Sequence, residues 1–357
     1  MTNHAENVEH LADLGIQATV YKYGLLDRLL TVLRRNPLAA WLVNRFRLLG
    51  PFERELQRRG TDLIYFVAPS ATPEILQTIN YIYTLYDLCH RDFPEFPEVR
   101  NFGIFQYREA VYRGCLAPAF LTLTESIQGA DAAVRRYGID RERILAMPLS
   151  PSPFISSPHS VSLDEVMSVN SLTPGYYFYP AQLWAHKNHI RILEATALLR
   201  QEGIVRQVVF AGGDQGLADH MKNRVAALQL EDQVRLLGFV PVEHMRGLYE
   251  GCAAVVMPTY FGPTNIPPLE AWSIGCPLIY SSHLSEQAGD AALLVDPDDA
   301  HSLANAMREV LDPAVAQRLV VSGRHRLVQI EEQRRDAEHA LLQRLQTFER
   351  RQQCWGM

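Results

Sequence analysis

Short apolar runs alternate with longer segments of helical periodicity in the second half of the chain, from Thr173 onward. The runs are rich in Val, Ile, Leu, Tyr and Phe and are bounded by Gly, Pro or Asp, which is typical of buried parallel strands. They cover residues 176–180, 207–212, 234–238, 253–258, 277–280 and 291–295. A helix is expected after Asn188, which stands at an N-cap position. The alternation predicts βαβ units and a parallel sheet.

The first half shows the same alternation less regularly. Strands are expected there over residues 16–21, 63–68, 80–85 and 120–124. Five prolines among many serines over 147–175 are incompatible with a continuous helix and favour a connection between domains. A charged segment of helical pattern follows Asp312 and runs almost to the end. We therefore expect an α/β protein with domains over 1–165 and 173–335 and a helical tail over 336–357.

Composition narrows the class of protein. The 357 residues are 47% hydrophobic and 21% charged, which is typical of a folded soluble protein. A formal charge of −6 argues against a general nucleic-acid binder. The five cysteines form no CxxC pair, so neither a zinc site nor a disulfide framework is expected. No apolar stretch is long enough to span a bilayer and Glu6 and Glu9 do not fit a signal peptide, so a cytoplasmic location is expected.

The segment 258–271 directly follows an apolar run and is expected to form a loop and then the start of a helix. In open α/β sheets, ligands bind beyond the carboxyl ends of the strands, so this loop is a candidate site. Gly262 and Asn265 tolerate unusual backbone conformations, and the prolines at 267 and 268 pre-set a helix N-terminus, which favours anions. Glu270 is expected in the first turn, where its carboxylate would suit a vicinal diol such as ribose. The alternative is that Glu270 only complements the helix dipole.

A second loop, within FYPAQLWAHKNH, leads from residue 178 into the helix after Asn188. Lys187 at that helix entrance would be a counter-charge for a diphosphate leaving group, and the alternative is a solvated loop lysine. His186 and His189 have no carboxylate or cysteine at ligand spacing, so no metal site is expected.

These motifs carry a resemblance to a known family. YPAQLWAHKNH, FGPTNIPPLEAWSIGCPLI, EQAGDAALLVDP and YDLCHRDFPEF (86–96) are similar to motifs of the GT-B retaining glycosyltransferases of the group 1 type, family 4. The most similar subgroup includes bacterial mannosyltransferases of surface-polysaccharide synthesis. The resemblance extends from about Asn7 to Leu311. It implies two Rossmann-like domains facing a cleft, with the nucleotide sugar on the second.

The resemblance also implies roles, position by position. Glu270 matches the ribose-binding glutamate and Lys187 the lysine that neutralises the diphosphate. The loop that reads the base is matched by Gly238, Phe239 and Val240. The turn that faces donor sugar and phosphate is matched by Thr264, Asn265 and Ile266, and Gln182 also lies on the donor side. On the acceptor side stand Asp87, His90 and Arg91. The reaction centre would hold Asp87, His90, Lys187 and Glu270, with a structural capping role as the alternative for His90.

The chain departs from the family pattern at several positions. The first glutamate of the family's E-x7-E motif is Gly262 here, the usual arginine before the lysine is Gln182, and the usual active-site histidine is Tyr86. Family members open with a strand and a glycine-rich loop, whereas HAENVEHLADLGIQATVY resembles their second unit. We therefore expect the first domain to lack its first βα unit, and the N-terminus to be truncated or misassigned.

A basic amphipathic segment lies over 22–60. Its nine bases and three acids give a local charge of +6, against −12 for the rest of the chain. Interleaved Leu, Val, Trp41 and Phe46 favour an interfacial segment at an anionic membrane surface. The alternative is an ordinary set of helices that pack a leucine face on the sheet and solvate their arginines.

The expected function is transfer of a hexose from a nucleotide sugar. The resemblance implies a metal-independent retaining enzyme without a cofactor, with GDP-mannose or another NDP-hexose as donor and a lipid-linked saccharide as acceptor, at the inner face of the cytoplasmic membrane. In the family, the departing phosphate accepts the proton of the acceptor hydroxyl. The alternatives are a non-catalytic nucleotide- or glycan-binding protein and a sugar-nucleotide epimerase. A nicotinamide enzyme is disfavoured because AGGDQG at 211–216 is not a GxGxxG motif.

Overall fold

The computed structural model describes residues 6–13, 15–34, 36–46, 48–156 and 161–355. They form two compact units whose segments interleave along the chain. The first unit takes the described parts of Met1–Leu85 together with Gln106–Leu123 and Ala133–Ile144. The second takes Tyr86–Phe105, Thr124–Ala132 and the described parts of Leu145–Met357. Residues 86–105 therefore belong to the same unit as the second sheet, although they lie in the first third of the sequence.

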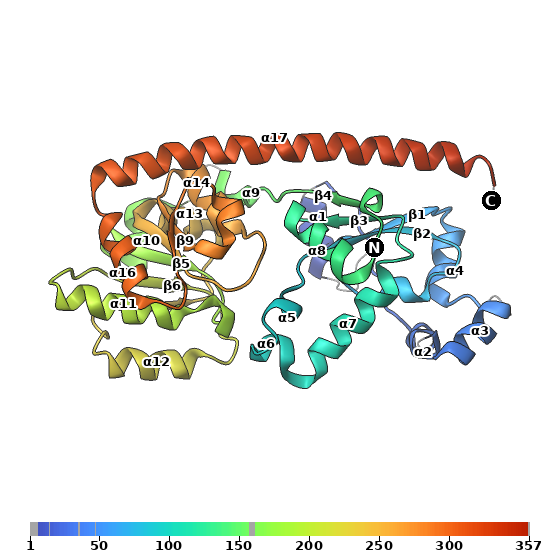
Figure 1. The fold of residues 1–357 in the computed structure, drawn as a ribbon, viewed down its shortest axis with the longest axis horizontal. Helices are drawn as coiled ribbons and strands as arrows, with labels where there is room; N and C mark the ends of the chain where they lie inside the picture. The colour runs from blue at the N-terminus through green and yellow to red at the C-terminus, as the bar shows by residue number, and fades with distance from the viewer. Residues whose placement is uncertain (1–5, 14, 35, 47, 157–160, 356–357) are drawn as a thin grey trace. The chain divides into compact units, whose positions relative to one another are not determined.

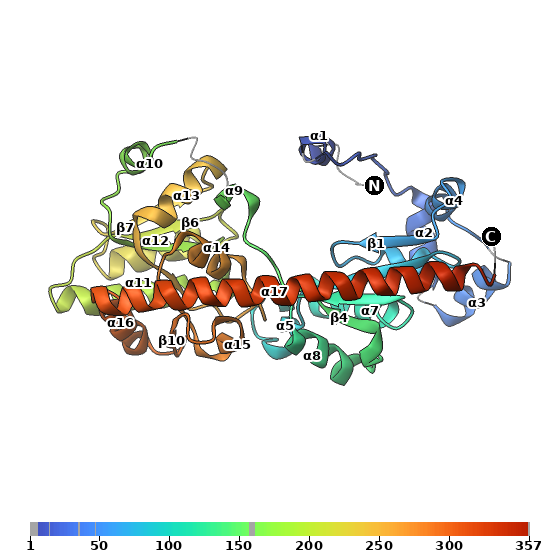
Figure 2. The ribbon, with the colours of Figure 1, turned by 90° about the horizontal axis from the view of Figure 1, so that it is seen from above.

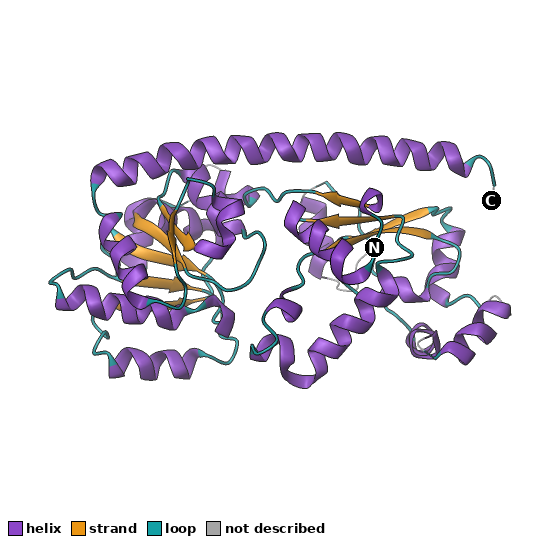
Figure 3. Ribbon diagram, viewed as in Figure 1, coloured by secondary structure: helices purple, strands orange, loops and turns teal. Residues whose placement is uncertain are grey.

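The second unit is built on a six-stranded parallel sheet (Figure 3). Its strands are β5 (Tyr176–Pro180), β6 (Val208–Ala211), β7 (Val234–Gly238), β8 (Cys252–Met257), β9 (Leu278–Ser281) and β10 (Leu293–Val295). All six predicted strands of the second half are confirmed, two of them with identical bounds. The order is β10-β9-β8-β5-β6-β7, and Tyr177 of β5 lies opposite Val208 on one side and Ala254 on the other. The order reverses between β5 and β8, which is the switch point of a doubly wound sheet.

Helices cover both faces of this sheet (Figure 1). On one face α11 (His189–Gln201) packs against α12 (Ala218–Ala227) and α16 (Ala300–Glu309). On the other face α13 (Val242–Gly251) and α14 (Ile266–Ile274) pack together, and α14 also packs against α17 (Pro313–Gln352). The short helix α15 (Ser285–Ala288) precedes β10.

The tyrosines of β5 show why both faces of the sheet are covered. Tyr176 and Tyr177 are buried, and their side chains alternate between the two faces, as successive residues of a strand do. The Tyr176 hydroxyl donates to the Leu248 carbonyl of α13 at 2.7 Å, and that of Tyr177 donates to the Met307 carbonyl of α16 at 2.6 Å. Each helix layer thus supplies an acceptor for a hydroxyl that would be expensive to bury alone.

The structure differs from the expected domain organisation in two places. The proline-rich stretch 147–175 holds two short helices, α9 (Pro153–Ser156) and α10 (Leu163–Val169), and both pack against α13. Pro153 is tolerated because it occupies the first helical position, and Ser162 caps α10 by accepting from the Glu165 N–H at 3.2 Å. The boundary expected after residue 335 falls inside α17, which is one continuous helix (Figure 2).

The first unit contains the sheet β1-β2-β3-β4. Its strands are β1 (Leu63–Phe66), β2 (Asn80–Leu85), β3 (Leu121–Thr124) and β4 (Ile144–Ala146), and β1 and β2 are parallel. Three predicted strands are confirmed, whereas 16–21 forms no strand and β4 was not expected. Ile16 and Val20 are exposed, so that apolar run has no sheet face to pack on. The longer helices here are α1 (Glu6–Asp13), α2 (Leu25–Arg34), α3 (Pro37–Arg45), α4 (Pro51–Arg58) and α7 (Ile104–Cys115). The helix α8 (Ile127–Tyr137) belongs to this unit from Ala133 onward.

Candidate functional site

The two loops singled out in the sequence lie at the switch point of the second sheet. One follows β5 and contains a 3-10 turn, Ala185–Lys187; the other follows β8 and leads into α14. The strands are parallel, so both loops leave from the same edge. Two hydrogen bonds join the loops: the main-chain oxygen of His186 accepts from the Tyr260 N–H at 2.9 Å and from the Thr259 hydroxyl at 3.3 Å. Ligands of doubly wound sheets bind at this place.

Lys187 points from the first loop to the second. Its Nζ donates to the Asn265 Oδ1 at 3.4 Å, just before α14 begins. Burial lowers the pKa of Lys187 to about 8, and the nearby Cys89 and Asp87 offset only part of this shift. The ammonium is still mainly protonated at pH 7, but it is poorly hydrated. A cation of this kind beside a helix N-terminus suits a phosphate group.

Asn188 occupies the expected N-cap position of α11 but does not cap the helix with its side chain. It adopts a left-handed conformation with φ of 59°, which asparagine tolerates better than most residues. Its Nδ2 donates to the Pro258 carbonyl at 3.1 Å and to the Pro297 carbonyl at 2.8 Å. The side chain therefore ties the first loop to two others and fixes the turn that carries Lys187.

Asn265 is the centre of the second loop. Its main-chain N–H donates to the Gln287 Oε1 at 2.9 Å, and its carbonyl accepts from the Gln287 Nε2 at 2.7 Å. Its own Nδ2 donates to the Tyr280 hydroxyl at 2.7 Å. The turn over 262–266 is thus held on both sides by buried polar groups, while Ile266 at the helix start remains partly exposed.

Glu270 lies in the second turn of α14, not in the first turn as expected, because the helix begins at Ile266. Its side chain is buried, with 4% exposed, and its Oε2 accepts from the Tyr249 hydroxyl at 2.5 Å. Burial and the neighbouring carboxylate raise the pKa of Tyr249 far above its ordinary value, so this hydroxyl keeps its proton and remains a donor. One carboxylate oxygen is therefore anchored by α13.

The remaining donor-side positions lie at the same edge of the sheet. Gly238 ends β7 with φ of 66° and accepts from the Gly212 N–H at 2.8 Å, while Phe239 is 91% exposed. Val240 is half-buried and packs against the core. Gln182 is exposed, and its Oε1 accepts from the Trp184 Nε1 and the Gln215 Nε2, each at 3.0 Å.

Residues 86–105 pack onto the second loop through aromatic side chains. They contain α5 (Cys89–Asp92) and α6 (Pro97–Arg100). Phe93 lies 5.5 Å from Phe261 and Phe96 lies 5.2 Å from Tyr260, measured between ring centroids. These contacts hold the segment against the loop that precedes α14.

Glu98 of α6 joins this segment to the first loop. Its Oε1 accepts from the His186 N–H at 2.8 Å and also contacts the ring Nδ1 of His186. The imidazole stacks on Phe261, with centroids 4.2 Å apart and an angle of 10° between the rings. Burial lowers the pKa of His186, and the Glu98 hydrogen bond offsets part of that. Burial opposes the ionisation of Glu98, but the hydrogen bonds from His186 outweigh it and hold its pKa below the usual value.

The acceptor-side candidates are spread over different environments. Asp87 is half-buried, its Oδ1 accepts from the Cys89 N–H at 2.9 Å, and its charge acts on Lys187. Arg91 is half-buried. His90 is fully buried, and its ring packs against Phe105 with centroids 5.3 Å apart. This position favours the structural alternative for His90, and its catalytic role stays a prediction.

Glu125 also belongs to this region, although it was not among the predicted site residues. It follows β3 directly, and its Oε2 accepts from the Thr264 hydroxyl at 2.6 Å. Burial is the main cause that raises the pKa of Glu125 to about 7; the Thr264 hydrogen bond opposes this shift and the charge of Asp87 adds to it.

Residues 167–326 match the sequence model of the family described as glycosyl transferases group 1. This segment is a group 1 glycosyltransferase domain. The chain is 29% identical over 282 residues to the O-antigen chain mannosyltransferase B of Escherichia coli, covering 77% of this chain and 72% of the relative. It is 24% identical over 192 residues to the O-antigen chain mannosyltransferase RfbU of Salmonella typhimurium, covering 53% of this chain and half of the relative.

A solved structure extends the likeness in fold to most of the chain. HepE of Anabaena, in complex with UDP and glucose, superposes with a TM-score of 0.68 at 18% identity, over 93% of this chain and 88% of that one. The GT-B fold, with two Rossmann-like domains, is therefore confirmed. The protein is a glycosyltransferase, and two of its relatives are named as O-antigen chain mannosyltransferases.

Four polar residues of this glycosyltransferase site were missed in the sequence: Glu98, Glu125, Tyr280 and Gln287. Glu125 could have been found, because it directly follows the apolar run expected over 120–124. Gln287 stands in the EQAGDAALLVDP stretch that carries the family resemblance, whereas Glu98 and Tyr280 carried no local signal. Among the described residues, no group of three or more His, Cys, Asp or Glu side chains could hold a metal ion.

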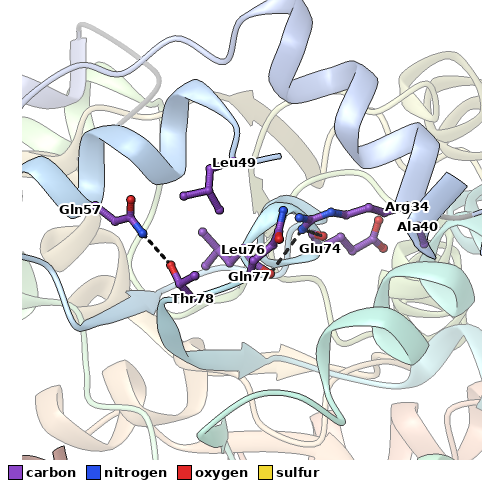
Figure 4. A pocket seen from close by; sticks show the side chains of 8 residues that line it. All are labelled: Arg34, Ala40, Leu49, Gln57, Glu74, Leu76, Gln77 and Thr78. Carbon is purple, nitrogen blue, oxygen red and sulfur yellow. Dashed lines mark hydrogen bonds between the residues drawn. The ribbon is translucent and has the colours of Figure 1, made fainter. Parts of the chain in front are cut away.

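A separate hollow of about 830 Å³ lies in the first unit of the glycosyltransferase (Figure 4). It is lined by Arg34, Ala40, Leu49, Gln57, Glu74, Leu76, Gln77 and Thr78. Arg34 reaches across it to donate to the Glu74 carbonyl at 2.9 Å, and Gln57 donates to the Thr78 hydroxyl at 2.9 Å. Arg34 thereby ties α2 to the turn before β2.

Proposed function

We propose that this glycosyltransferase moves mannose from a nucleoside-diphosphate mannose, with GDP-mannose as the first candidate, to a growing surface polysaccharide on a lipid carrier. The mannose assignment is supported by two relatives named as O-antigen mannosyltransferases. The observation that carries the donor site is the contact between Lys187 and Asn265 at the switch point of the second sheet.

In this proposal the donor lies across the two loops. Lys187 and the positive end of the α14 dipole, with the N–H of Ile266, bind the diphosphate, and the loop at 238–240 reads the base. Glu270 offers its Oε1 to the ribose hydroxyls, because its Oε2 is already bonded to Tyr249. Charge on the leaving diphosphate is then stabilised by the ammonium and the helix N-terminus without a metal ion.

The transfer step needs no strong base from the protein. The acceptor hydroxyl oxygen bonds to the anomeric carbon of the sugar while the bond from that carbon to the β-phosphate oxygen breaks. The hydroxyl proton passes to the departing phosphate oxygen on the same face, so the anomeric configuration is retained and a nucleoside diphosphate is released. Asp87 lies on the acceptor side, within electrostatic reach of Lys187.

Calorimetric binding of GDP, UDP, ADP and dTDP tests the donor site. We expect one diphosphate to bind best, and Lys187→Ala and Glu270→Ala to weaken it at least tenfold. The matched controls are Lys222→Ala and Glu243→Ala, both exposed on the surface, which should bind as the wild type does. Absence of binding by the folded wild-type chain contradicts the proposal.

Turnover then separates transfer from the alternatives. The purified chain is given the nucleotide sugar of the preferred base, with and without a lipid-linked saccharide. We expect mannosylated product only with the acceptor. Release of free sugar without it favours epimerase-like chemistry, and tight binding without any turnover favours a non-catalytic partner protein.

We further propose that α2 and α3 bind an anionic lipid surface. Large apolar side chains are exposed there, including Leu25 at 84%, Leu38 at 79% and Trp41 at 63%. Lys22, Arg28 and Arg45 are exposed on the same segment. Among the described residues, no helix combines the length and the apolar character needed to cross a membrane.

Two of the three acids of this segment are buried, and the third, Glu55, pairs with Arg58 and Arg59 of the region after α3. Asp27 is buried, and it accepts from the Phe52 N–H at 3.1 Å and from the Gly24 N–H at 3.1 Å. Glu53 is buried as well, and its Oε1 accepts from the Gln77 N–H at 2.7 Å. The only acid of α2 and α3 is the buried Asp27, so the exposed charges of these two helices are those of bases, which supports binding to anionic headgroups at about 1 kcal/mol per base.

Vesicle co-sedimentation tests this surface. We expect binding to vesicles with anionic phospholipid at low salt, weaker binding at high salt, and little binding to neutral vesicles. Trp41→Ala should reduce binding to anionic vesicles. Trp355→Ala should leave this binding unchanged, because it removes a tryptophan of the second unit that is 52% exposed. Equal binding of both variants, or none by the wild type at low salt, contradicts the proposal.

A further inference from the structure

Glu125 and Thr264 come from distant parts of the chain and meet in one hydrogen bond. They are 139 residues apart, and the Thr264 hydroxyl donates to the Glu125 Oε2 at 2.6 Å. Thr264 belongs to the turn that leads into α14, beside Asn265 and its contact with Lys187. The carboxyl group of Glu125 is thus held at the edge of the candidate donor site.

The turn itself provides no acidic side chain at this point. Gly262 has φ of 99°, and a Cβ there would lie 2.9 Å from the Asn265 Nδ2 and 3.0 Å from the Thr264 carbonyl oxygen. A side chain at 262 would therefore require the turn to shift. Any carboxyl group in this turn has to come from another segment, and Glu125 is placed to supply it.

The free oxygen of Glu125 is the one available for a ligand. Oε2 is anchored by Thr264, and the structure shows no protein hydrogen bond to Oε1 from the residues it describes. Glu125 is only half-buried, so Oε1 is not enclosed by packing. A carboxyl group with one oxygen fixed and the other free is a good partner for a neutral hydroxyl group.

Charge decides which part of a nucleotide sugar this group can bind. The charge of Asp87 acts on Glu125, so two acids lie on this side of the site. A phosphate would be repelled here and is better placed near Lys187 and the start of α14. The raised pKa of Glu125, about 7, also lets the group either donate or accept at neutral pH.

We propose that Glu125 binds a hydroxyl group of the hexose part of the nucleotide sugar and thereby selects the sugar. This inference rests on the proposed glycosyl transfer, and it assigns the recognition of the hexose to a residue that follows β3. Lys187, Glu270 and the 238–240 loop would bind the nucleotide diphosphate, while Glu125 would act only on the sugar.

Separate titrations of a nucleoside diphosphate and its sugar conjugate test the assignment. The probes are GDP and GDP-mannose, or the pair with the base that binds best. We expect Glu125→Ala to leave the Kd of the diphosphate within about twofold and to weaken the sugar conjugate about tenfold, the effect of losing a hydrogen bond to a charged group. Glu125→Gln keeps the shape of the side chain and one acceptor oxygen, so its Kd for the sugar conjugate should lie between those of the wild type and Glu125→Ala.

Variants of Thr264 separate sugar binding from a structural role. Thr264→Val removes the donor that orients Glu125, whereas Thr264→Ser keeps it. We expect the valine variant to lose affinity for the sugar conjugate but not for the diphosphate, and the serine variant to bind both as the wild type does. Thermal unfolding of each variant verifies that the chain is folded.

The outcomes distinguish the two proposals. If the wild type binds no nucleoside diphosphate, the proposed function fails and this inference fails with it. If the wild type binds both probes and Glu125→Ala weakens them equally, the proposed function stands, but Glu125 has only a structural role. If neither affinity changes, Glu125 does not contact the sugar.

Discussion

Glu98 accepts a hydrogen bond from the main-chain N–H of His186 at 2.8 Å, and the same carboxylate oxygen contacts the ring Nδ1 of that histidine. His186 precedes Lys187 in the turn after β5, and Glu98 lies on α6 within the 86–105 segment. The pair fixes the main chain of the turn next to Lys187. Glu98 is therefore a positioning residue, because it acts through His186.

Glu98→Gln should weaken this link and lower stability in a pH-dependent way. The pKa values of Glu98 and His186 both lie below their ordinary values in the folded chain, so each group contributes more stability above its unfolded pKa than below it. Wild-type stability should therefore fall as the pH drops below about 6.5, where unfolded histidine starts to gain its proton. Denaturant unfolding between pH 4 and 8 measures this.

In Glu98→Gln we expect lower stability at pH 7. Between about pH 6.5 and 4.5 the stability should fall more steeply than in the wild type, because the hydrogen bond that raises the pKa of His186 is gone. The matched control is Glu250→Gln, which removes a carboxylate that pairs with Arg246 on α13, at an Oε1 to Nε distance of 2.9 Å. A Glu98 variant with the same pH profile as the wild type would show that the pair does not contribute.

The affinity for a nucleoside diphosphate should fall above pH 8. Lys187 has its pKa lowered to about 8, and only its protonated form attracts the diphosphate, so binding is retained below that pH and lost as the pH rises through it. A bound diphosphate raises the pKa, which moves the midpoint upward. Lys187→Arg should abolish the pH dependence, since arginine keeps its charge. Calorimetry from pH 6.5 to 9.5 measures the diphosphate affinity of the wild type and of Lys187→Arg. If the affinity of both proteins changes with pH in the same way, Lys187 does not have this role.

Tyr249→Phe should weaken ribose binding through Glu270. The change removes the hydroxyl that donates to the Glu270 Oε2 at 2.5 Å and leaves a buried carboxylate with one donor fewer. We expect the free energy of unfolding to fall by about 1–3 kcal/mol. Comparison of the diphosphate with its 2′,3′-dideoxy analogue gives the specific readout. The wild type should discriminate between them and the variant less so, whereas undiminished discrimination would mean that Glu270 does not need Tyr249.

Gly262→Ala should disturb the turn before α14. The alanine would sit at φ of 99° and contact the Asn265 side chain, so we expect a loss of about 1–3 kcal/mol in stability and weaker binding of the nucleotide sugar. Gly213→Ala is the control, because a Cβ there meets nothing within 4 Å. If the two variants unfold at the same temperature, the turn is more adaptable than its contacts indicate.

Strand positions in the second sheet could be predicted closely from the sequence. The bounds 176–180 and 234–238 agree with β5 and β7, because buried parallel strands are short apolar runs with clear breakers at their ends. The run at 16–21 has the same pattern but forms no strand. An apolar run indicates that a segment can form a strand, but it does not show that a neighbouring strand is present to pair with it.

For the candidate site, the sequence by itself determined which loops matter and which residue types they carry. Lys187 and Asn265 follow apolar runs, and the parallel topology brings the ends of such runs to one edge. Only the tertiary structure decided the partners of those residues. Glu98 lies 88 residues from His186, and Glu125 lies 139 residues from Thr264. A single hydrogen bond between distant segments depends on how whole elements pack, and it leaves no periodic trace in the sequence.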